Sequence, residues 1–221
     1  MSAPSTTAAV PRAGSADGVD ELTRRILGAS RVLVARWGVA KTSLADVARE
    51  AGCSRASVYR AFPGGKAQLF HTLGVHELDA YLHEVLAVID AADDLEGAVT
   101  SGLVAATRLL QDHDAAQFVL RHEPGLLLPF LGFKQVDVLY GHTAAVVGPR
   151  LERFVPAERA AWLSEWIARL FISYLSNPDP SIDLADAGAA RRLVAGFVLP
   201  TFTPDTATSP HPHGTRTRSR S

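Results

Sequence analysis

Apolar side chains recur every three or four positions along almost the whole chain between about residues 20 and 202, and no convincing run alternates apolar with polar residues. This period is that of one face of an α-helix, whereas strict alternation is typical of a strand. The pattern therefore excludes sheet-based folds and predicts an all-α protein. The two ends, 1–18 and 203–221, are rich in small residues and proline without any period, and we expect both to be disordered tails.

Composition narrows the class of protein further. A single cysteine among 221 residues excludes an internal disulfide and a multi-cysteine zinc site. The longest nearly uncharged stretch, Pro124 to Phe133, is about half the length of a membrane helix. The first 20 residues lack the basic start and apolar run of a secretory leader. We therefore expect a cytoplasmic protein with no membrane partner.

The formal net charge of −1 hides an uneven distribution of charge along the chain. The segment from Arg24 to Lys66 contains nine Lys or Arg and two Asp or Glu, so its net charge is +7. The segment from Glu77 to Pro210 contains nine Lys or Arg and 18 Asp or Glu, so its net charge is −9. A basic head thus precedes an acidic body, and the near-neutral total does not exclude nucleic acid as a partner.

The basic head has the helix signals of a compact unit. The apolar stripe predicts a first helix from about Asp20 to Trp37, with Trp37 in the core and Gly38 as its end. Ser43 and Asp46 have the spacing of a capping box and predict the start of a short second helix.

Gly52 ends that second helix, and Ser54 caps a third from Arg55 to Phe62, where Pro63 stops it. Two short helices joined by a three-residue turn that contains glycine form a helix-turn-helix layout.

The rest of the chain reads as a helical bundle. A long helix is predicted from about Lys66 to Asp90, after a Gly-Gly loop. Further helices are predicted over 95–111, 115–122, 129–147, 156–176 and 183–202. The expected organisation is a head over 19–66 and a body over 67–202.

The turn and its flanking helices contain a specific motif. From Thr42 to Phe70 the chain reads TSLADVAREAGCSRASVYRAFPGGKAQLF. A Thr-Ser pair opens the second helix, A-G-x-S forms the turn, an apolar residue precedes Tyr59, and Phe62 and Lys66 follow. In this pattern the segment resembles the DNA-binding domain of the TetR family of transcriptional regulators. The segment departs from the pattern of many family members at one place, because three residues rather than two separate Phe62 from Lys66.

The resemblance implies that this head binds DNA, and the residue types fit that role. Arginine offers paired donors to guanine in the major groove, so Arg55 and Ser57 are candidates for reading bases, and Ala56 for contact with a thymine methyl. Hydroxyl and charged side chains are candidates for phosphate contacts, although Ser43 and Ser54 also cap helices and Arg55 and Arg60 would suit a solvated face. The predicted DNA contacts are Thr42, Ser43, Ser54, Arg55, Ala56, Ser57, Tyr59, Arg60 and Lys66.

The resemblance also implies dimerisation and an effector pocket in the body. A head that reads one half-site needs a second copy, so we expect a homodimer on a palindromic operator. The predicted interface lies in the last two helices, at Ala161, Ile167, Ala168, Phe171, Tyr174, Leu175, Leu193, Val194 and Phe197. The predicted pocket for a small, hydrophobic ligand involves Phe118, His122, Phe130, Phe133, Tyr140, Trp162 and Trp166. Each of these side chains would also suit an ordinary core.

Enzyme motifs are missing from the sequence. No glycine-rich phosphate loop, nucleophile elbow or H-E-x-x-H occurs, and we expect neither a cofactor nor a metal. The sequence therefore predicts a ligand-responsive regulator of transcription, most often a repressor in this family. Two alternatives stay open, namely an architectural DNA-binding protein without a ligand, and an all-helical enzyme or carrier whose head only packs.

Overall fold

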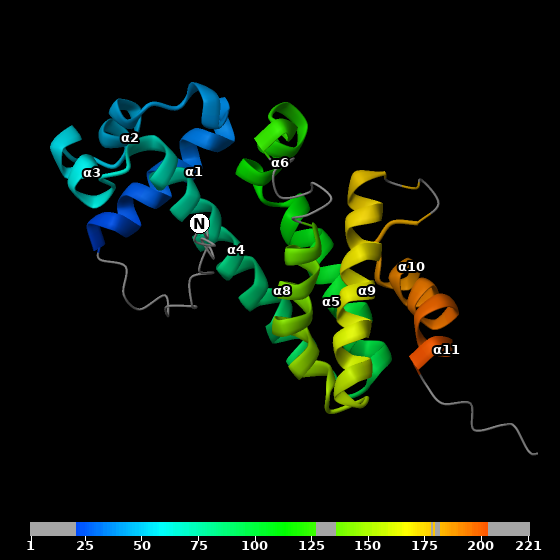
Figure 1. The fold of residues 1–221 in the computed structure, drawn as a ribbon. Helices are drawn as coiled ribbons and strands as arrows, with labels where there is room; N and C mark the ends of the chain where they lie inside the picture. Colours follow the sequence, from blue (N-terminus) through cyan, green and yellow to red (C-terminus); the bar gives the residue numbers. More distant parts are fainter. Residues whose placement is uncertain (1–20, 127–135, 178, 180–181, 203–221) are drawn as a thin grey trace, which may run out of the picture. The chain divides into compact units, whose positions relative to one another are not determined.

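The computed structural model describes residues 21–126, 136–177, 179 and 182–202. Every regular element in these ranges is a helix (Figure 1), which confirms the all-α prediction. The elements are α1 (Glu21–Lys41), α2 (Leu44–Glu50), α3 (Arg55–Ala61), α4 (Gly65–Asp90), α5 (Leu95–Gln111), α6 (Asp114–His122), η2 (Pro124–Leu126), α8 (Val136–Leu151), α9 (Ala157–Ser176), α10 (Ala187–Leu193), η3 (Val194–Val198) and α11 (Leu199–Phe202). In these same ranges, no helix has the length and apolar character needed to cross a membrane.

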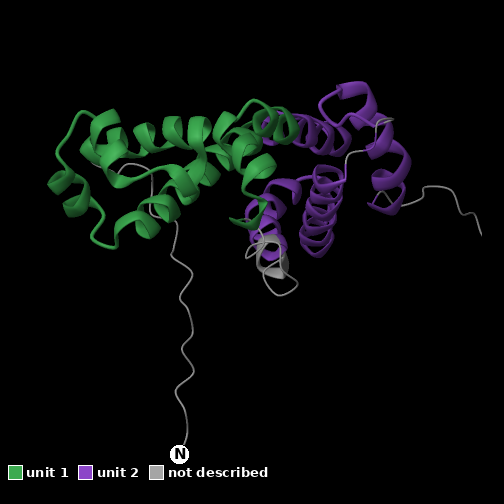
Figure 2. Cartoon of the chain, turned by 90° about the horizontal axis from the view of Figure 1, so that it is seen from above, with its two compact units in different colours: residues 1–87, 105–139 green, residues 88–104, 140–221 purple. Residues whose placement is uncertain are grey.

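The chain forms two compact units (Figure 2). Unit 1 comprises residues 1–87 and 105–139, and unit 2 comprises 88–104 and 140–221. All three boundaries between the units fall inside helices, since α4, α5 and α8 each contribute residues to both units. The sequence places its boundary at residue 66 instead, and the predicted division into a DNA-binding head and an effector body stays a prediction. The two predicted tails lie outside the described residues.

Unit 1 has a core built from the apolar stripes of its short helices. Ile26 and Leu33 of α1, Val47 of α2, Val58 of α3 and Leu69 of α4 are fully or almost fully buried in one cluster. Burying one such side chain contributes about 1.5–3 kcal/mol relative to leaving it exposed. Because every helix of the head contributes to this cluster, α2 and α3 are held in place although each has only seven residues.

Helix α1 is kinked at Gly38, where φ is +81° and ψ is 172°. Only glycine adopts this conformation without strain. The predicted end of the helix at Gly38 thus corresponds to the kink, and a further turn leads to Lys41. Trp37 is 43% exposed, so its predicted place in the core is wrong. The periodic stripe continues to Trp37, but Val34 is the last apolar side chain of α1 that is buried in the core cluster.

Helix α6 is attached to α4 at its first turn. His113 caps α6, because its Nδ1 accepts from the Ala116 amide (3.1 Å). Its Nε2 lies 2.8 Å from Oε2 of Glu77. The hydrogen bond to Glu77 raises the pKa of His113, with burial acting in the opposite sense. Burial raises the pKa of Glu77, but the hydrogen bond from His113 and the nearby positive charges hold it below its ordinary value.

Unit 2 joins the start of α5 to α8, α9 and the last helices. Leu163 of α9 and Val198 of η3 are completely buried. Arg150 of α8 forms an ion pair with Asp90 (3.0 Å), and Arg191 of α10 forms one with Glu96 of α5 (2.5 Å). The expected helix over 129–147 corresponds to α8 from Val136 onward, and its first part falls outside the described residues.

The last predicted helix, 183–202, is divided into three pieces. Asp186 accepts from the Ala189 amide (2.7 Å) and caps α10, so the helix starts later than predicted. A π-helical turn, η3, follows α10 and leads into α11. In η3, Val194 and Val198 are buried, whereas Phe197 is 70% exposed. The π turn therefore presents a large aromatic side chain to solvent between two buried valines.

Candidate nucleic-acid interface

The first turn of α2 is fixed by the predicted capping box. The Asp46 amide donates to the Ser43 hydroxyl (3.2 Å), and the Ser43 amide donates to the Asp46 carboxylate (3.2 Å). The Ser43 hydroxyl also donates to that carboxylate (2.5 Å). The hydrogen bonds from the Ser43 side chain and backbone hold the pKa of Asp46 below its ordinary value. The box is therefore complete at neutral pH and loses its charged acceptor as the pH falls through the Asp46 pKa.

The turn between α2 and α3 is closed by local and distant contacts. Gly52 has φ +63°, and the Cys53 amide donates to the Ala48 carbonyl (2.9 Å). Ser54 caps α3 by accepting from the Ser57 amide (3.0 Å), as predicted. Arg25 of α1 donates to the carbonyls of Ala51 (3.0 Å) and Gly52 (3.4 Å). The helix-turn-helix is therefore tied directly to α1.

Helix α3 has one buried and one exposed face. Val58 is completely buried and Phe62, at the end of the helix, is almost so. The side chains of Arg55, Ala56, Tyr59 and Arg60 lie on the exposed face. Ser57 is partly buried, its hydroxyl lies 2.9 Å from that of Ser54, and it accepts from Arg60 (3.3 Å). The exposed face of α3 thus carries two arginines, a tyrosine hydroxyl and a small side chain.

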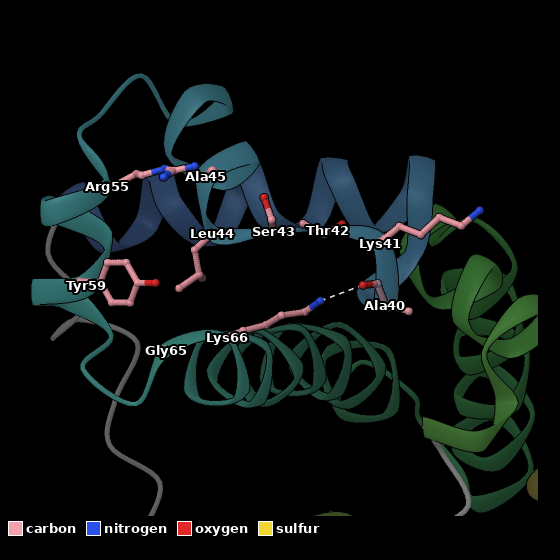
Figure 3. Close-up of a pocket in the computed structure, with 10 residues that line it drawn as sticks. All are labelled: Ala40, Lys41, Thr42, Ser43, Leu44, Ala45, Arg55, Tyr59, Gly65 and Lys66. Atoms are coloured by element: carbon pink, nitrogen blue, oxygen red, sulfur yellow. Dashed lines mark hydrogen bonds between the residues drawn. The ribbon is translucent and has the colours of Figure 1, made fainter.

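An open hollow in unit 1 brings several of these residues together (Figure 3). Arg55 and Tyr59 extend from α3 toward the start of α2, and Lys66 extends from α4 toward Ala40. The Lys66 ammonium donates to the Ala40 carbonyl (2.9 Å). The charged lining residues, Lys41, Arg55 and Lys66, are all basic. It is lined by Ala40, Lys41, Thr42, Ser43, Leu44, Ala45, Arg55, Tyr59, Gly65 and Lys66.

Thr42 differs from the expectation for a phosphate contact. Its side chain is completely buried, and its hydroxyl donates to the Gly38 carbonyl (2.7 Å). The hydroxyl is therefore used to close the connection between α1 and α2 and is not presented to solvent. Of the other predicted contacts, Ser43, Arg55, Tyr59 and Lys66 line the hollow, and Ser54, Ala56, Ser57 and Arg60 lie elsewhere on or beside α3.

Sequence reasoning missed Lys41 and Arg25. Lys41 lines the hollow, and its position directly before the Thr-Ser pair was the signal that could have identified it. In the sequence Arg25 resembles the other basic residues on the solvent-exposed face of α1, yet its guanidinium binds the turn between α2 and α3. No local pattern identifies that contact, because its partner carbonyls lie 26 and 27 residues away.

The predicted ligand-pocket residues are distributed over both units. Phe118 and His122 of α6 lie in unit 1, with ring centroids 4.6 Å apart. Tyr140, Trp162 and Trp166 lie in unit 2, whereas Phe130 and Phe133 lie outside the described residues. Tyr140 is buried, and the guanidinium carbon of Arg169 lies 4.1 Å from its ring centroid. Trp162 is 52% exposed, and its ring centroid lies 4.8 Å from that of Phe202. The predicted pocket stays a prediction.

The predicted dimer residues fall into two groups. Ala168, Leu193 and Val194 are buried within the single chain, so their side chains belong to the core of unit 2 rather than to a free surface. The second group is exposed or partly exposed and stays available for a partner. It comprises Ala161, Ile167, Phe171, Tyr174, Leu175 and Phe197.

The fold and the hollow define a class of protein, namely an all-helical chain with a helix-turn-helix and a basic exposed face. A family model described as "Bacterial regulatory proteins, tetR family" matches residues 26–73. The HTH-type transcriptional regulator Mb2274c of Mycobacterium bovis is 39% identical over 167 residues, which are 75% of this chain and 86% of the relative. Rv2250c of Mycobacterium tuberculosis, also an HTH-type regulator, is 32% identical with the same coverage. The chain belongs to the TetR family of transcriptional regulators.

Solved structures of regulators share the fold. The TetR family repressor AlkX from a Dietzia strain covers 84% of this chain and 98% of its own, with a TM-score of 0.59 and 19% identity. The fatty acid degradation regulator FadR from Bacillus halodurans covers 81% and 97%, with a TM-score of 0.56 and 13% identity.

The relatives and the fold neighbours are regulators, and this chain is a regulator rather than an enzyme. In the ranges that the structure describes, no group of three or more His, Cys, Asp or Glu could hold a metal ion.

Proposed function

We propose that this chain is a repressor that binds a palindromic operator as a homodimer and is released by a small hydrophobic ligand. TetR-family regulators bind operator DNA and are typically dimeric with small-molecule effectors. The observation that carries the proposal is the exposed face of α3 beside the hollow, where Arg55, Tyr59, Ser43 and Lys66 converge from three elements. A regulator of this kind acts in the cytoplasm, where its operator is.

The chemistry of this surface suits duplex DNA. Arg55 extends from the first turn of α3, where a guanidinium can donate two hydrogen bonds to guanine in the major groove. Lys66, Lys41, Arg60 and the hydroxyls of Ser43 and Tyr59 are suited to phosphates, which set register without reading sequence. In this role the Ser43 hydroxyl still accepts from the Asp46 amide, while its single proton turns from the Asp46 carboxylate to a phosphate oxygen.

Exposed apolar side chains of the last helices support the proposed dimerisation. Phe197 is the most exposed large apolar side chain in the described residues, and Leu175 of α9 is also exposed. Large aromatic side chains are enriched at the centres of protein interfaces. A second copy that covers Phe197 would supply the second head for a palindrome, whose half-sites lie about 34–36 Å apart for helix-turn-helix dimers.

Selection from a random pool of duplex DNA tests the function. The full chain is expected to enrich a palindrome, and one small hydrophobic molecule from a screened panel is expected to abolish binding to it. Enrichment of no sequence, with equal binding to all duplexes, would favour the alternative of an architectural DNA-binding protein. A palindrome that no ligand releases would contradict the effector part of the proposal alone.

Arg55→Ala is expected to relax sequence preference at one base pair of each half-site. Loss of a bidentate contact to guanine costs about 1–3 kcal/mol at that pair and leaves the others unchanged. Titration of the variant against operators with single substitutions measures this effect. An unchanged preference profile would contradict a base-reading role for Arg55.

Lys66→Ala is expected to weaken binding to all sequences about equally, because a phosphate contact carries no sequence information. The slope of log affinity against log salt should fall by about one. Arg192→Ala, which removes an exposed positive charge from α10 in unit 2, is the control and should leave the slope unchanged. A loss confined to one operator sequence would be inconsistent with this role for Lys66.

A further inference from the structure

Glu123 follows α6 directly and is bound to the backbone at the end of α1. Its Oε2 accepts from the Val39 amide (2.7 Å), and its Oε1 accepts from the Ala40 amide (2.9 Å). A carboxylate that accepts two amides makes hydrogen bonds roughly twice as strong as neutral ones. The acidic side chain that directly follows α6 thus binds two successive amides that lie 84 and 83 residues away in the chain.

The backbone of α1 is shaped for this carboxylate. At Gly38, a Cβ atom would lie 2.6 Å from Oε1 of Glu123 and 2.6 Å from a ring carbon of Phe118. The positive φ of Gly38 turns the next two amides away from the helical path, where they would otherwise donate along the helix. The kink and the carboxylate therefore form one structure, which we call the Glu123 latch and define as Gly38, Val39, Ala40 and Glu123.

The latched segment is also the edge of the basic hollow. The Ala40 amide donates to Glu123, and the carbonyl of the same residue accepts from Lys66 (2.9 Å). The Gly38 carbonyl accepts from Thr42 (2.7 Å), directly before the Ser43 cap of α2. The last residues of α1 are thus fixed on one side by Glu123 and on the other by the lysine of the hollow.

We infer that Glu123 is a positioning residue for operator binding, which holds residues 38–42 so that Lys66 and the start of α2 meet the DNA. This inference rests on the proposed function. Without the carboxylate, the two amides lose their acceptor and the segment populates other arrangements. Apparent affinity falls in proportion to the population of the competent arrangement.

The sign of the effect separates positioning from charge. Glu123→Gln makes the chain less negative, so electrostatics alone would leave DNA binding unchanged or tighten it. Loss of positioning weakens it instead. Glu84→Gln is the matched control, because Glu84 is an exposed glutamate of α4 in the same unit and the change in charge is identical.

The test measures operator affinity and amide hydrogen exchange for the full chain, Glu123→Gln, Glu123→Asp and Glu84→Gln. We expect Glu123→Gln to bind the operator about three- to thirtyfold more weakly than Glu84→Gln. Because glutamine keeps one acceptor oxygen, at least one of the Val39 and Ala40 amides should exchange faster in that variant, while the amides of α3 keep their protection. Glu123→Asp, which keeps the charge, should fall between wild type and Glu123→Gln.

Two results would overturn the inference while the proposed function stands. One is equal operator affinity of the two glutamine variants, and the other is unchanged exchange at Val39 and Ala40 in Glu123→Gln. A wild-type chain that binds no duplex would instead contradict the proposed function itself. If Glu123→Gln is unfolded at the assay temperature, the comparison of Glu123→Asp with wild type, which has the same charge, decides, and equal affinity of that pair would likewise overturn it.

Discussion

Phe197→Asp is expected to convert the proposed homodimer into a monomer that no longer holds its operator. A buried aromatic anchor contributes about 2 kcal/mol or more at an interface, and in a two-fold dimer the substitution occurs twice. The dissociation constant of the dimer should therefore rise about a thousandfold. Because Phe197 is 70% exposed in the single chain, the melting temperature of the monomer should change little. Analytical ultracentrifugation over a range of concentrations measures both the mass and the dissociation.

Two control variants accompany that measurement. Phe197→Leu keeps an apolar side chain and should remain dimeric. Ala91→Asp introduces the same charge at an exposed residue of unit 2 between α4 and α5 and should also remain dimeric. A Phe197→Asp chain that sediments as wild type would place the interface elsewhere.

Gly38→Ala is expected to lower the free energy of unfolding by about 2–4 kcal/mol. The backbone there has φ +81° and ψ 172°, a region that costs a residue with a side chain about 1–3 kcal/mol. The added Cβ would also meet Glu123 and Phe118 at 2.6 Å, so the latch or the kink must shift. Chemical denaturation of wild type and of Gly38→Ala measures the loss of unfolding free energy.

Gly28→Ala is the matched control for this prediction. Gly28 lies in the same helix, is exposed, and has no atom within 4 Å of the added Cβ. Alanine there should stabilise the chain by about 0.5–1 kcal/mol, because glycine is unfavourable inside a helix. Equal effects of the two substitutions would contradict the special role of Gly38.

The parts of the site that sequence could predict depend on neighbours in the chain. The Ser43–Asp46 box, the Ser54 cap and the Gly52 turn each join residues within a few positions, so spacing alone identifies them. The start of α3 and both ends of α5 fall at the predicted residues for the same reason. Local hydrogen bonds and helix capping therefore account for the correct part of the prediction.

The remaining features arise from packing between distant segments. The bonds of Glu123 to α1 and of Arg25 to the turn join residues far apart in sequence, and no periodic pattern records them. Trp37 shows the limit of periodicity, which assigns a face to a helix but does not indicate where the opposing core ends. The π turn at Val194–Val198 has the same origin, since the apolar pattern of 183–202 fits a continuous helix equally well.

The central claim is that α3 and its surroundings read a specific operator. Its most direct test is fluorescence anisotropy of the full chain with the selected palindrome and with a scrambled duplex of the same base composition, at one fixed salt concentration. The account predicts at least about a thousandfold tighter binding to the palindrome. Equal affinity for the two duplexes would contradict it.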